Sequence, residues 1–468
     1  MLAAIILKEL NELIRDGRIR IVAVISILLL IIASITGVNQ YQKNKDQYTV
    51  SSATERTVWE TQEEKNPHSA AHYGTYIFKP KFALSVFDYG VSAYTGNSIF
   101  IEAHNQNEAS YSEAADQTSL ARFGTLSINF VLLYLFPLII ILIGYNSYTK
   151  EKEHQTYLLL KSQGVAPVQL ALGKWLATLI PISVVTTLVF LTVGIVIFNL
   201  ENFVFFNWVD LFALLSLYLF YYLIITSITI LISMWSKSSG ISLIFSLLVW
   251  MLFSFISPKI ATNFANSNHP YPSKFEFNAK IEEDKKNGLD GHNPWNEAAK
   301  KLEEETLTAY GVERIDELPF NYVGYRMQKG EEHEAEIYKK HYSLLKDIAQ
   351  LQNNTYKNIS FITPFIALRF LSMELANSSD QLHWKFSEAV EKYRIQKQQF
   401  LNYDIKDNST YGQRGYKMSS EKFKNLPKFN FKPPTLLEIL KGNQQNLLFL
   451  ILWLLVPFTA LILSSKKI

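Results

Sequence analysis

The chain contains no cysteine among its 468 residues. This absence excludes disulfides, thiolate metal sites, iron–sulfur clusters and cysteine nucleophiles. The formal net charge is only +3, so the basic field that nucleic-acid binding requires is missing and we expect no nucleic-acid partner. A phosphate-binding loop is missing too, because the one tempting pair, Gly173-Lys174, lacks a second glycine at the required offset and precedes Trp175. We therefore expect neither enzymatic activity nor a resident cofactor in this chain.

Charge is also missing locally, although 19% of all residues are charged. A bilayer core of about 30 Å requires about 20 apolar residues in a helix, and a backbone in lipid must satisfy its own hydrogen bonds. The uncharged apolar stretches therefore predict an all-α membrane protein with six transmembrane helices. These spans cover residues 21–38, 126–146, 175–198, 211–233, 240–257 and 447–464.

Lysine and arginine cluster in the segments on one side of these spans, which predicts that this side is cytoplasmic. The basic residues are Lys8, Arg15, Arg18, Arg20, Lys150, Lys152, Lys161, Lys174, Lys237, Lys466 and Lys467. Both termini are then cytoplasmic, and two large segments, 39–125 and 258–445, lie outside. We expect them to form one extracytoplasmic domain that is mainly helical, with some β-structure possible.

Residues 1–20 have an amphipathic pattern. Leu2, Ile6, Leu10 and Leu13 recur at helical spacing, with charged residues between them. The pattern predicts a helix that lies on the cytoplasmic membrane surface, in contact with lipid. The alternative is a helical extension of the first span.

The cytoplasmic segment 147–174 combines a charged turn with an apolar run. A short helix of this kind can insert apolar side chains into a partner protein while its acids contact basic residues there. The alternative is an ordinary solvated connector. The candidate coupling residues are Glu151, Glu153, Thr156, Leu158, Leu159, Leu160 and Lys174.

This segment resembles the membrane subunits of ABC transporters of the type-2 exporter class. In that class the segment reads Glu-x-Glu-x-Gly-Thr, followed by aliphatic residues, and Gly-Lys precedes the next span. The present chain departs by having Gln155 in place of the glycine.

Motifs in the two outer segments resemble a subgroup of that class defined by a domain of unknown function. It is similar to permeases described for multicopper-enzyme maturation. The motifs include Phe-Asp-Tyr-Gly at 87–90 and Leu-Pro-Phe-Asn at 318–321. The outer-motif residues of interest are Glu102, His104, Ser372, His383 and Arg394.

The resemblance implies an exporter permease of a bacterial inner membrane that works with a separate ATPase subunit, where ATP and Mg²⁺ bind. A second permease subunit, either a copy or a paralogue, would complete the complex. Glu151 and Glu153 would be the charged contacts to the ATPase, and residues 158–160 the buried ones. Two other functions remain open: an ATP-driven mechanical lever without substrate passage, and a membrane scaffold without an ATPase.

Three tyrosines, Tyr218, Tyr221 and Tyr222, fall near the middle of the fourth predicted span. They are candidates for lining a path for an amphipathic substrate. Ordinary helix packing is the alternative.

Histidines in the first outer segment are candidate metal ligands. His68 and His72 are four residues apart, and Glu102 and His104 follow in the same segment. Histidine and carboxylate groups bind zinc or copper. Because helical signals around residue 68 are weak, we favour polar packing, and the sequence alone assigns no metal site.

Overall fold

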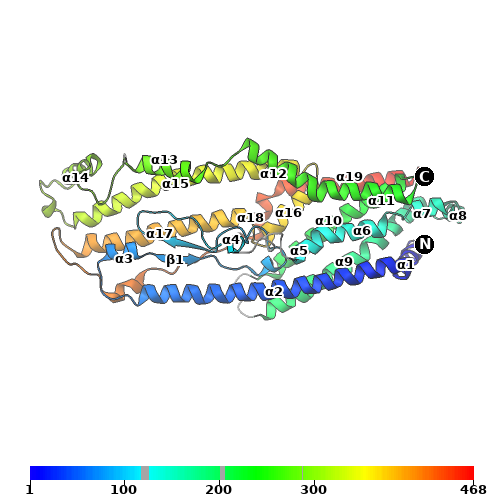
Figure 1. The fold of residues 1–468 in the computed structure, drawn as a ribbon, viewed down its shortest axis with the longest axis horizontal. Helices are drawn as coiled ribbons and strands as arrows, with labels where there is room; N and C mark the ends of the chain where they lie inside the picture. Colours follow the sequence, from blue (N-terminus) through cyan, green and yellow to red (C-terminus); the bar gives the residue numbers. More distant parts are fainter. Residues whose placement is uncertain (117–125, 201–205, 287, 468) are drawn as a thin grey trace.

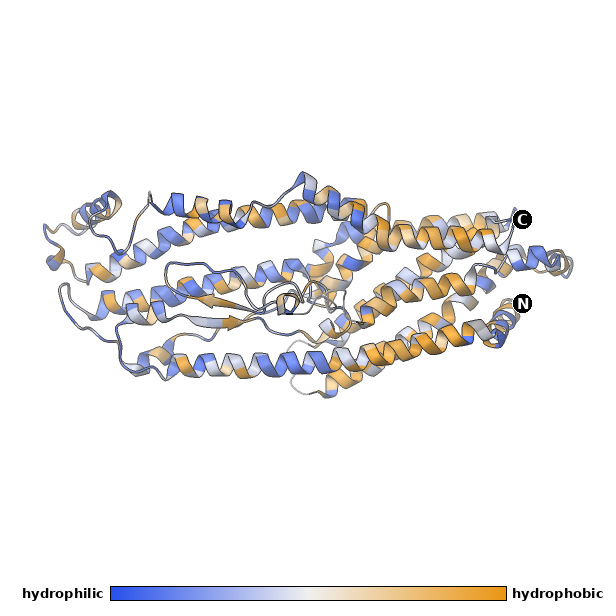
Figure 2. Ribbon diagram, viewed as in Figure 1, coloured by the Kyte–Doolittle hydropathy of each residue, from blue (hydrophilic) through white to orange (hydrophobic). Residues whose placement is uncertain are grey.

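The computed structural model describes residues 1–116, 126–200, 206–286 and 288–467. Residues 117–125, which belong to the first predicted outer segment, lie outside this description. The molecule is elongated, with apolar helices gathered at one end and polar helices at the other (Figures 1 and 2). Both chain termini lie at the far tip of the apolar end, and we call this tip the terminal end. The polar part, built from described residues of 39–125 and 258–445, is the projecting domain.

Six helices are long and apolar enough to cross a membrane, which confirms the all-α membrane fold. They cover Ile19–Glu60, Ile128–Glu153, Pro167–Asn199, Trp208–Trp235, Ser239–Asn268 and Gln444–Ser465. Each overlaps one predicted span, and several run beyond it because polar residues continue the helix past its apolar part. The helix α2 (Gly17–Glu60) is the clearest case, since it passes from the bundle into the projecting domain (Figure 1).

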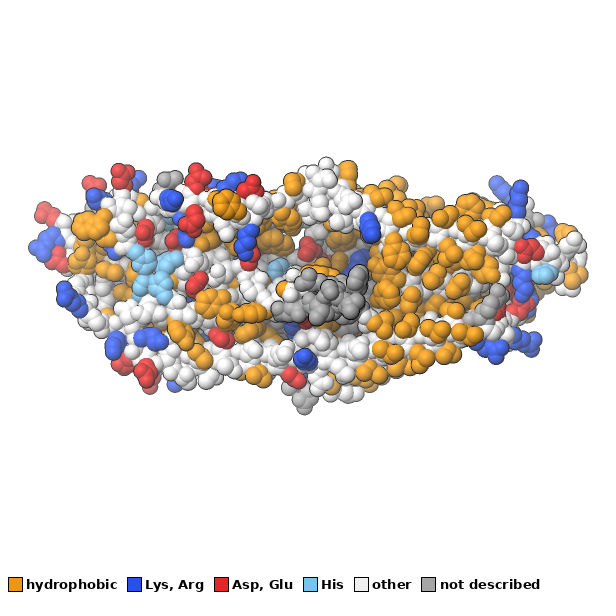
Figure 3. Space-filling view, in the orientation of Figure 1, with side chains coloured by type: hydrophobic (Ala, Val, Ile, Leu, Met, Phe, Trp, Pro, Cys, Tyr) orange, Lys and Arg blue, Asp and Glu red, His pale blue; other side chains and the backbone are white. Residues whose placement is uncertain are grey.

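The bundle is arranged around α10, which packs against α6, α9, α11 and α19. Its elements besides α2 are α5 (Ile128–Phe130), the π-helical turn η3 (Val131–Leu135), α6 (Phe136–Gly144), α9 (Pro167–Asn199), α10 (Trp208–Trp235), α11 (Ser239–Met251), the π-helical turn η4 (Leu252–Ile256) and α19 (Gln444–Ser465). The short helices α7 (Thr149–Glu153) and α8 (Thr156–Ser162) extend from the terminal end. Because all spans except α10 and α6 leave most of their apolar window unburied within the chain, the bundle presents a wide apolar belt to its surroundings (Figure 3).

The N-terminal helix α1 (Leu2–Arg15) is separate from α2. Asp16 between them has an extended conformation, so the chain does not form one continuous helix. α1 packs against α9, and the contact is close at Gly173, where a Cβ atom would lie 2.5 Å from Ile5 Cγ2. α1 is thus a separate helix seated on the bundle, and its place on the membrane surface stays a prediction.

The projecting domain is mainly helical. Its helices are α3 (Pro67–Tyr73), α4 (Glu113–Asp116), α12 (Ser257–Asn268), α13 (Lys274–Lys286), α14 (Glu297–Tyr310), α15 (Tyr322–Ile359), α16 (Pro364–Leu375), α17 (Asp380–Asn408) and α18 (Leu436–Gly442), with the 3-10 turns η1 (Ala83–Val86), η5 (Ile315–Glu317) and η6 (Ser420–Asn425). The long helices α15 and α17 pack together, and α3 packs on α17. β1 (Thr75–Phe78) and β2 (Ser98–Ile101) form an antiparallel pair in which Thr75 faces Ile101. This pair is the small β-component that the sequence allowed.

The buried helix α16 joins the projecting domain to the bundle. It contacts α10 and α19 on one side and α15 and α18 on the other. Its N-terminus is capped by Thr363, whose side chain accepts a hydrogen bond from the Phe365 N–H. The two parts of the molecule therefore share one continuous apolar core.

Candidate functional site

The charged turn at the terminal end is tied to four different helices. It consists of residues 150–153 in α7, and each of these side chains binds a different neighbour. Lys150 Nζ lies 2.9 Å from a carboxylate oxygen of Glu12 in α1. Lys152 Nζ donates to the Met234 carbonyl at 2.6 Å, which satisfies one of the free carbonyls at the end of α10.

Glu151 ties α7 to α9 and α1. Its carboxylate lies 3.2 Å from Lys174 Nζ and 2.9 Å from Lys8 Nζ. The Lys174 ammonium, with its side chain only 1% exposed, is also 2.8 Å from Glu9 in α1. The Thr156 hydroxyl donates to the same Glu151 carboxylate. These partners turn Glu151 inward, so it does not offer the outward charge that we expected at this position.

Glu153 ties α7 to the start of α11. Its carboxylate accepts hydrogen bonds from the Ser239 N–H at 2.7 Å and from the Ser239 hydroxyl at 2.8 Å. A carboxylate at a helix N-terminus is favourable because free N–H groups and the helix dipole both point at it. Glu153 therefore also makes an internal link, rather than only the outward contact that the resemblance implied.

The next helix, α8, presents apolar side chains to the outside. Leu158 and Leu159 are 68% and 57% exposed, whereas Tyr157 is buried against the bundle and Leu160 packs against the same cluster. Gln155 begins α8 in the left-handed region, with a φ of 59°. This conformation favours glycine, the residue at this place in the pattern that the segment resembles. The turn forms with glutamine nevertheless, so the departure from the family pattern leaves the helix intact.

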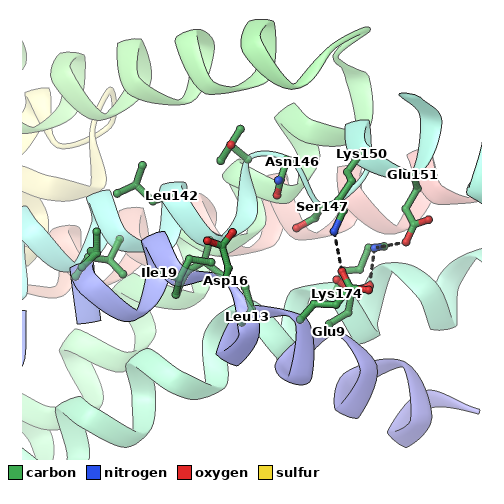
Figure 4. Close-up of a pocket in the computed structure, with 15 residues that line it drawn as sticks. Glu9, Leu13, Asp16, Ile19, Leu142, Asn146, Ser147, Lys150, Glu151 and Lys174 are labelled. Carbon is green, nitrogen blue, oxygen red and sulfur yellow. Dashed lines mark hydrogen bonds and ion pairs between the residues drawn. The ribbon is translucent and has the colours of Figure 1, made fainter. Parts of the chain in front are cut away.

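A cavity of about 190 Å³ lies beside these contacts, between α1, the start of α2 and the α6–α7 segment (Figure 4). Its wall combines apolar groups such as Leu13 and Leu142 with the ionic groups of Glu9, Lys150 and Lys174. The hydrogen bond from Lys150 and the charge of Lys8 lower the pKa of Glu12 at its edge, although burial opposes this effect.

The three tyrosines in α10 are fully buried inside this single chain. The Tyr218 hydroxyl lies 2.9 Å from Ser372 Oγ, and the Tyr222 hydroxyl donates to the Leu132 carbonyl at 2.9 Å. Tyr221 shares the same core. Within one subunit this arrangement supports the helix-packing alternative, not a lined path.

Ser372 belongs to a buried polar network where α16 meets the bundle. Its hydroxyl donates to Asp88 Oδ2 at 2.5 Å, while Arg369 pairs with Asp88 Oδ1 at 2.7 Å. Asp88 is completely buried, and these two donors compensate its charge. The network fixes the first outer segment to α16, so Ser372 has a positioning role there.

Along α17, Arg394 is buried and His383 is half-buried. Arg394 makes two contacts of 2.8 Å with Glu391, the ion pair expected at a spacing of three residues, and one of 3.1 Å with Glu331 in α15. It also donates to the Glu102 carbonyl. Burial, with a smaller contribution from the charge of Lys79, lowers the pKa of His383 to about 4. His383 therefore stays neutral at ordinary pH.

The candidate histidines meet in one cluster on the projecting domain (Figure 3). His68, His72 and His104 are joined there by His292, from the loop between α13 and α14, which the sequence did not single out. Glu102 is not among them, because its carboxylate accepts hydrogen bonds from nearby asparagine side chains.

The environments of these rings differ strongly. Burial and the neighbouring His72 lower the pKa of His68 to about 4. Against the effect of burial, hydrogen bonds to Glu331 and Glu334 raise the pKa of His104 to about 9. Neither Glu331 nor Glu334 was identified as a site residue from the sequence. Their spacing of three residues on one helix is the signal that the sequence offers for them.

Comparison with protein families gives two matches. Residues 29–260 match the sequence model described as ABC-2 family transporter protein, and residues 274–432 match a domain of unknown function (DUF3526). No curated protein matches the chain. The chain thus carries a region similar to ABC-2 permeases, which are membrane components of ABC transporters and typically not themselves catalytic, followed by an additional domain. Neither match supports the expected link to multicopper-enzyme maturation.

Proposed function

Because residues 29–260 carry an ABC-2 permease domain, we propose that this chain is the membrane subunit of an ABC exporter that works with a separate ATPase. The observation that carries the proposal is α8, whose exposed Leu158 and Leu159 extend from a base tied to four helices. Exposed apolar side chains at the tip of a short helix are suited to a pocket in a partner protein. ATP and Mg²⁺ would bind in that partner.

The proposed coupling runs through α7. A change of shape in the ATPase would displace α8, and the side chains of residues 150–153 would pass the displacement to α1, α9, α10 and α11. Glu151 and Glu153 act in this scheme as the internal linkage, while Leu158 and Leu159 make the contact with the ATPase. Because Lys174 and Glu151 are buried, water and salt weaken the attraction between them only little. Their ion pair can therefore hold α7 and α9 together while the helices move.

The proposal places the terminal end in the cytoplasm and the projecting domain outside a bacterial inner membrane. The excess of lysine and arginine at the terminal end supports this orientation. The exposed apolar faces of α2, α9, α11 and α19 would meet lipid or a second permease subunit, whether a copy or a paralogue. Substrate passage would then use the interface between subunits, since the tyrosines of α10 fill the core of a single subunit.

A mechanical lever is the second candidate function. The supporting observation is α2, a continuous helix of 44 residues that joins the bundle to the projecting domain. At 1.5 Å per residue such a helix is roughly 65 Å long, so a tilt at the terminal end would be carried to the far end of the domain. In this case the same ATPase would move an envelope partner instead of a substrate.

The test is purification of the full chain in mild detergent after cross-linking, with mass spectrometry of the proteins that accompany it. We expect a co-purifying ATPase with the phosphate-binding loop that this chain lacks. Leu159→Asp should reduce its recovery at least about tenfold, because a charge would enter an apolar contact. Leu344→Asp is the matched control, since Leu344 in α15 is 54% exposed, similar to Leu159, but lies in the projecting domain.

Equal recovery of the ATPase with Leu159→Asp and wild type would refute the docking role of α8. Recovery of the wild-type chain without any ATPase would instead favour the scaffold function. Reconstituted vesicles distinguish the remaining two functions, because a lever hydrolyses ATP without moving solute across the membrane.

A further inference from the structure

Four histidine rings converge on one surface point of the projecting domain, although they come from three separate segments. His68 and His72 lie on α3, His104 follows β2, and His292 belongs to the loop before α14. One ring nitrogen from each lies within 4.8 Å of those of the other three. The chain contains only nine histidines, so four of them at one place are a concentration that surface composition does not explain.

The spacing of these nitrogens suits a tetrahedral metal ion. His68 Nε2 and His72 Nε2 are 3.0 Å apart, and His104 Nε2 and His292 Nε2 are 2.6 Å apart. Ligand nitrogens around a tetrahedral Zn²⁺ ion, each about 2.05 Å from the metal, are about 3.3 Å from one another. The observed distances, from 2.6 to at most 4.8 Å, bracket this value. Small side-chain rotations would therefore bring all four nitrogens to bonding distance.

Hydrogen bonding among the rings does not account for the cluster. The two short nitrogen–nitrogen contacts join the rings in two pairs, His68 with His72 and His104 with His292. These contacts give no reason for the two pairs to lie next to each other. The rings are nevertheless packed together, with all six centroid distances between 4.4 and 6.2 Å. A shared cation gives every ring an electrostatic reason to point at the same place.

Two carboxylates contact the Nδ1 side of His104 and orient its ring for metal binding. His104 Nδ1 lies 2.9 Å from Glu331 and 2.9 Å from Glu334, both on α15. Donation from Nδ1–H to a carboxylate fixes the tautomer that leaves the Nε2 lone pair free, and it makes Nε2 a stronger ligand. Glu331 is held in turn by the buried Arg394. This is the arrangement of outer contacts that metal-bound histidines usually have.

The backbone is also arranged to bring the rings together. His104 has a φ of 65°, a left-handed conformation that costs free energy for a residue other than glycine. It is held there by its N–H, which donates to Glu331 at 3.0 Å, and by its carbonyl, which accepts from Lys285 at 3.0 Å. Strain that the surroundings maintain in this way is typical of functional positions.

The loop that carries His292 is seated directly on α15. Gly291 and Gly330 are in such close contact that a Cβ atom on Gly330 would lie 2.6 Å from Gly291 Cα. Arg326 donates to the Gly291 carbonyl at 3.1 Å, and Asp290 accepts from the His292 N–H at 2.8 Å. These contacts place His292 opposite His104.

We propose that His68, His72, His104 and His292 bind one divalent late transition-metal ion, with Zn²⁺ the best fit to the geometry. Imidazole nitrogen suits this class of ion, whereas Mg²⁺ and Ca²⁺ require oxygen ligands. Four protein ligands leave no open coordination position, so the site is structural and not catalytic. Because three ligands come from the first outer segment and His292 from the second, the ion clamps the two halves of the projecting domain together.

The experiment uses the full chain in detergent, stripped with a chelator and titrated with Zn²⁺ against a chromophoric competitor. We expect one equivalent of tightly bound Zn²⁺ per chain, and Co²⁺ in its place should give the visible spectrum of a tetrahedral nitrogen site. His292→Ala and His72→Ala, which change exposed side chains, should each weaken binding at least about tenfold. His269→Ala is the control, because this histidine lies in the projecting domain outside the cluster and should leave Zn²⁺ affinity unchanged.

Glu334→Gln tests the outer contact separately from the ligands, and we expect a loss of about 10–100-fold in Zn²⁺ affinity. It also keeps the proposal testable if an alanine variant fails to fold. Wild-type chain that binds no Zn²⁺, or binding that His292→Ala and His72→Ala leave unchanged, would overturn the proposal.

Discussion

The terminal end and the projecting domain each contain a buried lysine, and the two are compensated in different ways. Lys174 at the terminal end lies 2.8 Å from Glu9 and 3.2 Å from Glu151. Lys397 in the projecting domain is equally buried, but among the described residues no hydrogen-bond acceptor contacts its Nζ. The Lys397 ammonium lies instead 4.3 Å from the ring centroid of Trp59.

The difference shows what each region is built to do. At the terminal end opposite charges meet inside the protein, so helices that must move together are joined by specific ionic contacts. In the projecting domain the lysine has a cation–π contact with Trp59 and only a through-space attraction to Glu55, and burial lowers the pKa of Lys397 to about 7. The same substitution should therefore change stability in opposite directions in the two regions.

The largest effect is expected for Lys174→Met. Among the described residues, removing the ammonium leaves the carboxylates of Glu9 and Glu151 with only Lys8 as a cationic partner, in a site that is mostly inaccessible to water. Loss of one partner from a buried ion pair typically costs about 3 kcal/mol. We expect a destabilisation of this size, measured by denaturant unfolding of the purified chain in detergent micelles.

Glu9→Gln combined with Lys174→Met should recover part of that loss, because one of the uncompensated carboxylates is removed. If Lys174→Met alone unfolds at the wild-type denaturant concentration, the ionic contacts are not what holds α1 and α7 to α9.

Lys397→Met is expected to stabilise the projecting domain near neutral pH, by about 2 kcal/mol, since an apolar side chain replaces a buried charge whose Nζ has no hydrogen-bond acceptor among the described residues. The direction in which wild-type stability changes with pH follows from the number of protons bound in the folded and unfolded states. Between the folded pKa of about 7 and the unfolded pKa of about 10.4, the unfolded wild-type chain binds more protons. Wild-type stability should therefore rise with pH across this interval, whereas the variant lacks this contribution.

Unfolding measured at about pH 6 and about pH 9.5 checks this expectation, because the advantage of Lys397→Met should shrink at the higher pH. A variant that is less stable than wild type at both values would show that the contact with Trp59 outweighs the cost of burying the ammonium.

The sequence predicts the bundle well because its signal is local. A run of about 20 uncharged apolar residues has only one stable form in lipid, so the helices of the bundle can be read from the chain directly. The same holds for α1, whose apolar residues recur at a spacing set by the helix itself. The left-handed turn at Gln155 is local too. The pattern that the segment resembles has glycine at this position, so the turn could be located from the sequence.

The sites are less predictable because their members are far apart in the chain. Glu9 and Lys174 are 165 residues apart, and His104 and His292 are 188 residues apart. No periodicity links such pairs, and only packing shows that Glu151 faces inward or that His292 completes a cluster. The tyrosines of α10 illustrate the same point, since their spacing fits a lined path and a packed core equally well until their neighbours are known.

The smallest effect is expected for Lys150→Met, and it isolates the contribution of burial. The pair Lys150–Glu12 has a separation of 2.9 Å, close to the 2.8 Å of Lys174–Glu9, but its side chains are 51% and 41% exposed. An ion pair in water gains little because solvent and salt screen it, so the substitution should cost about 0.5 kcal/mol or less. The same unfolding measurement should place Lys150→Met close to wild type and far from Lys174→Met. A cost as large as that of Lys174→Met would mean that the number of ties between α7 and its neighbours, and not their burial, determines the stability of the terminal end.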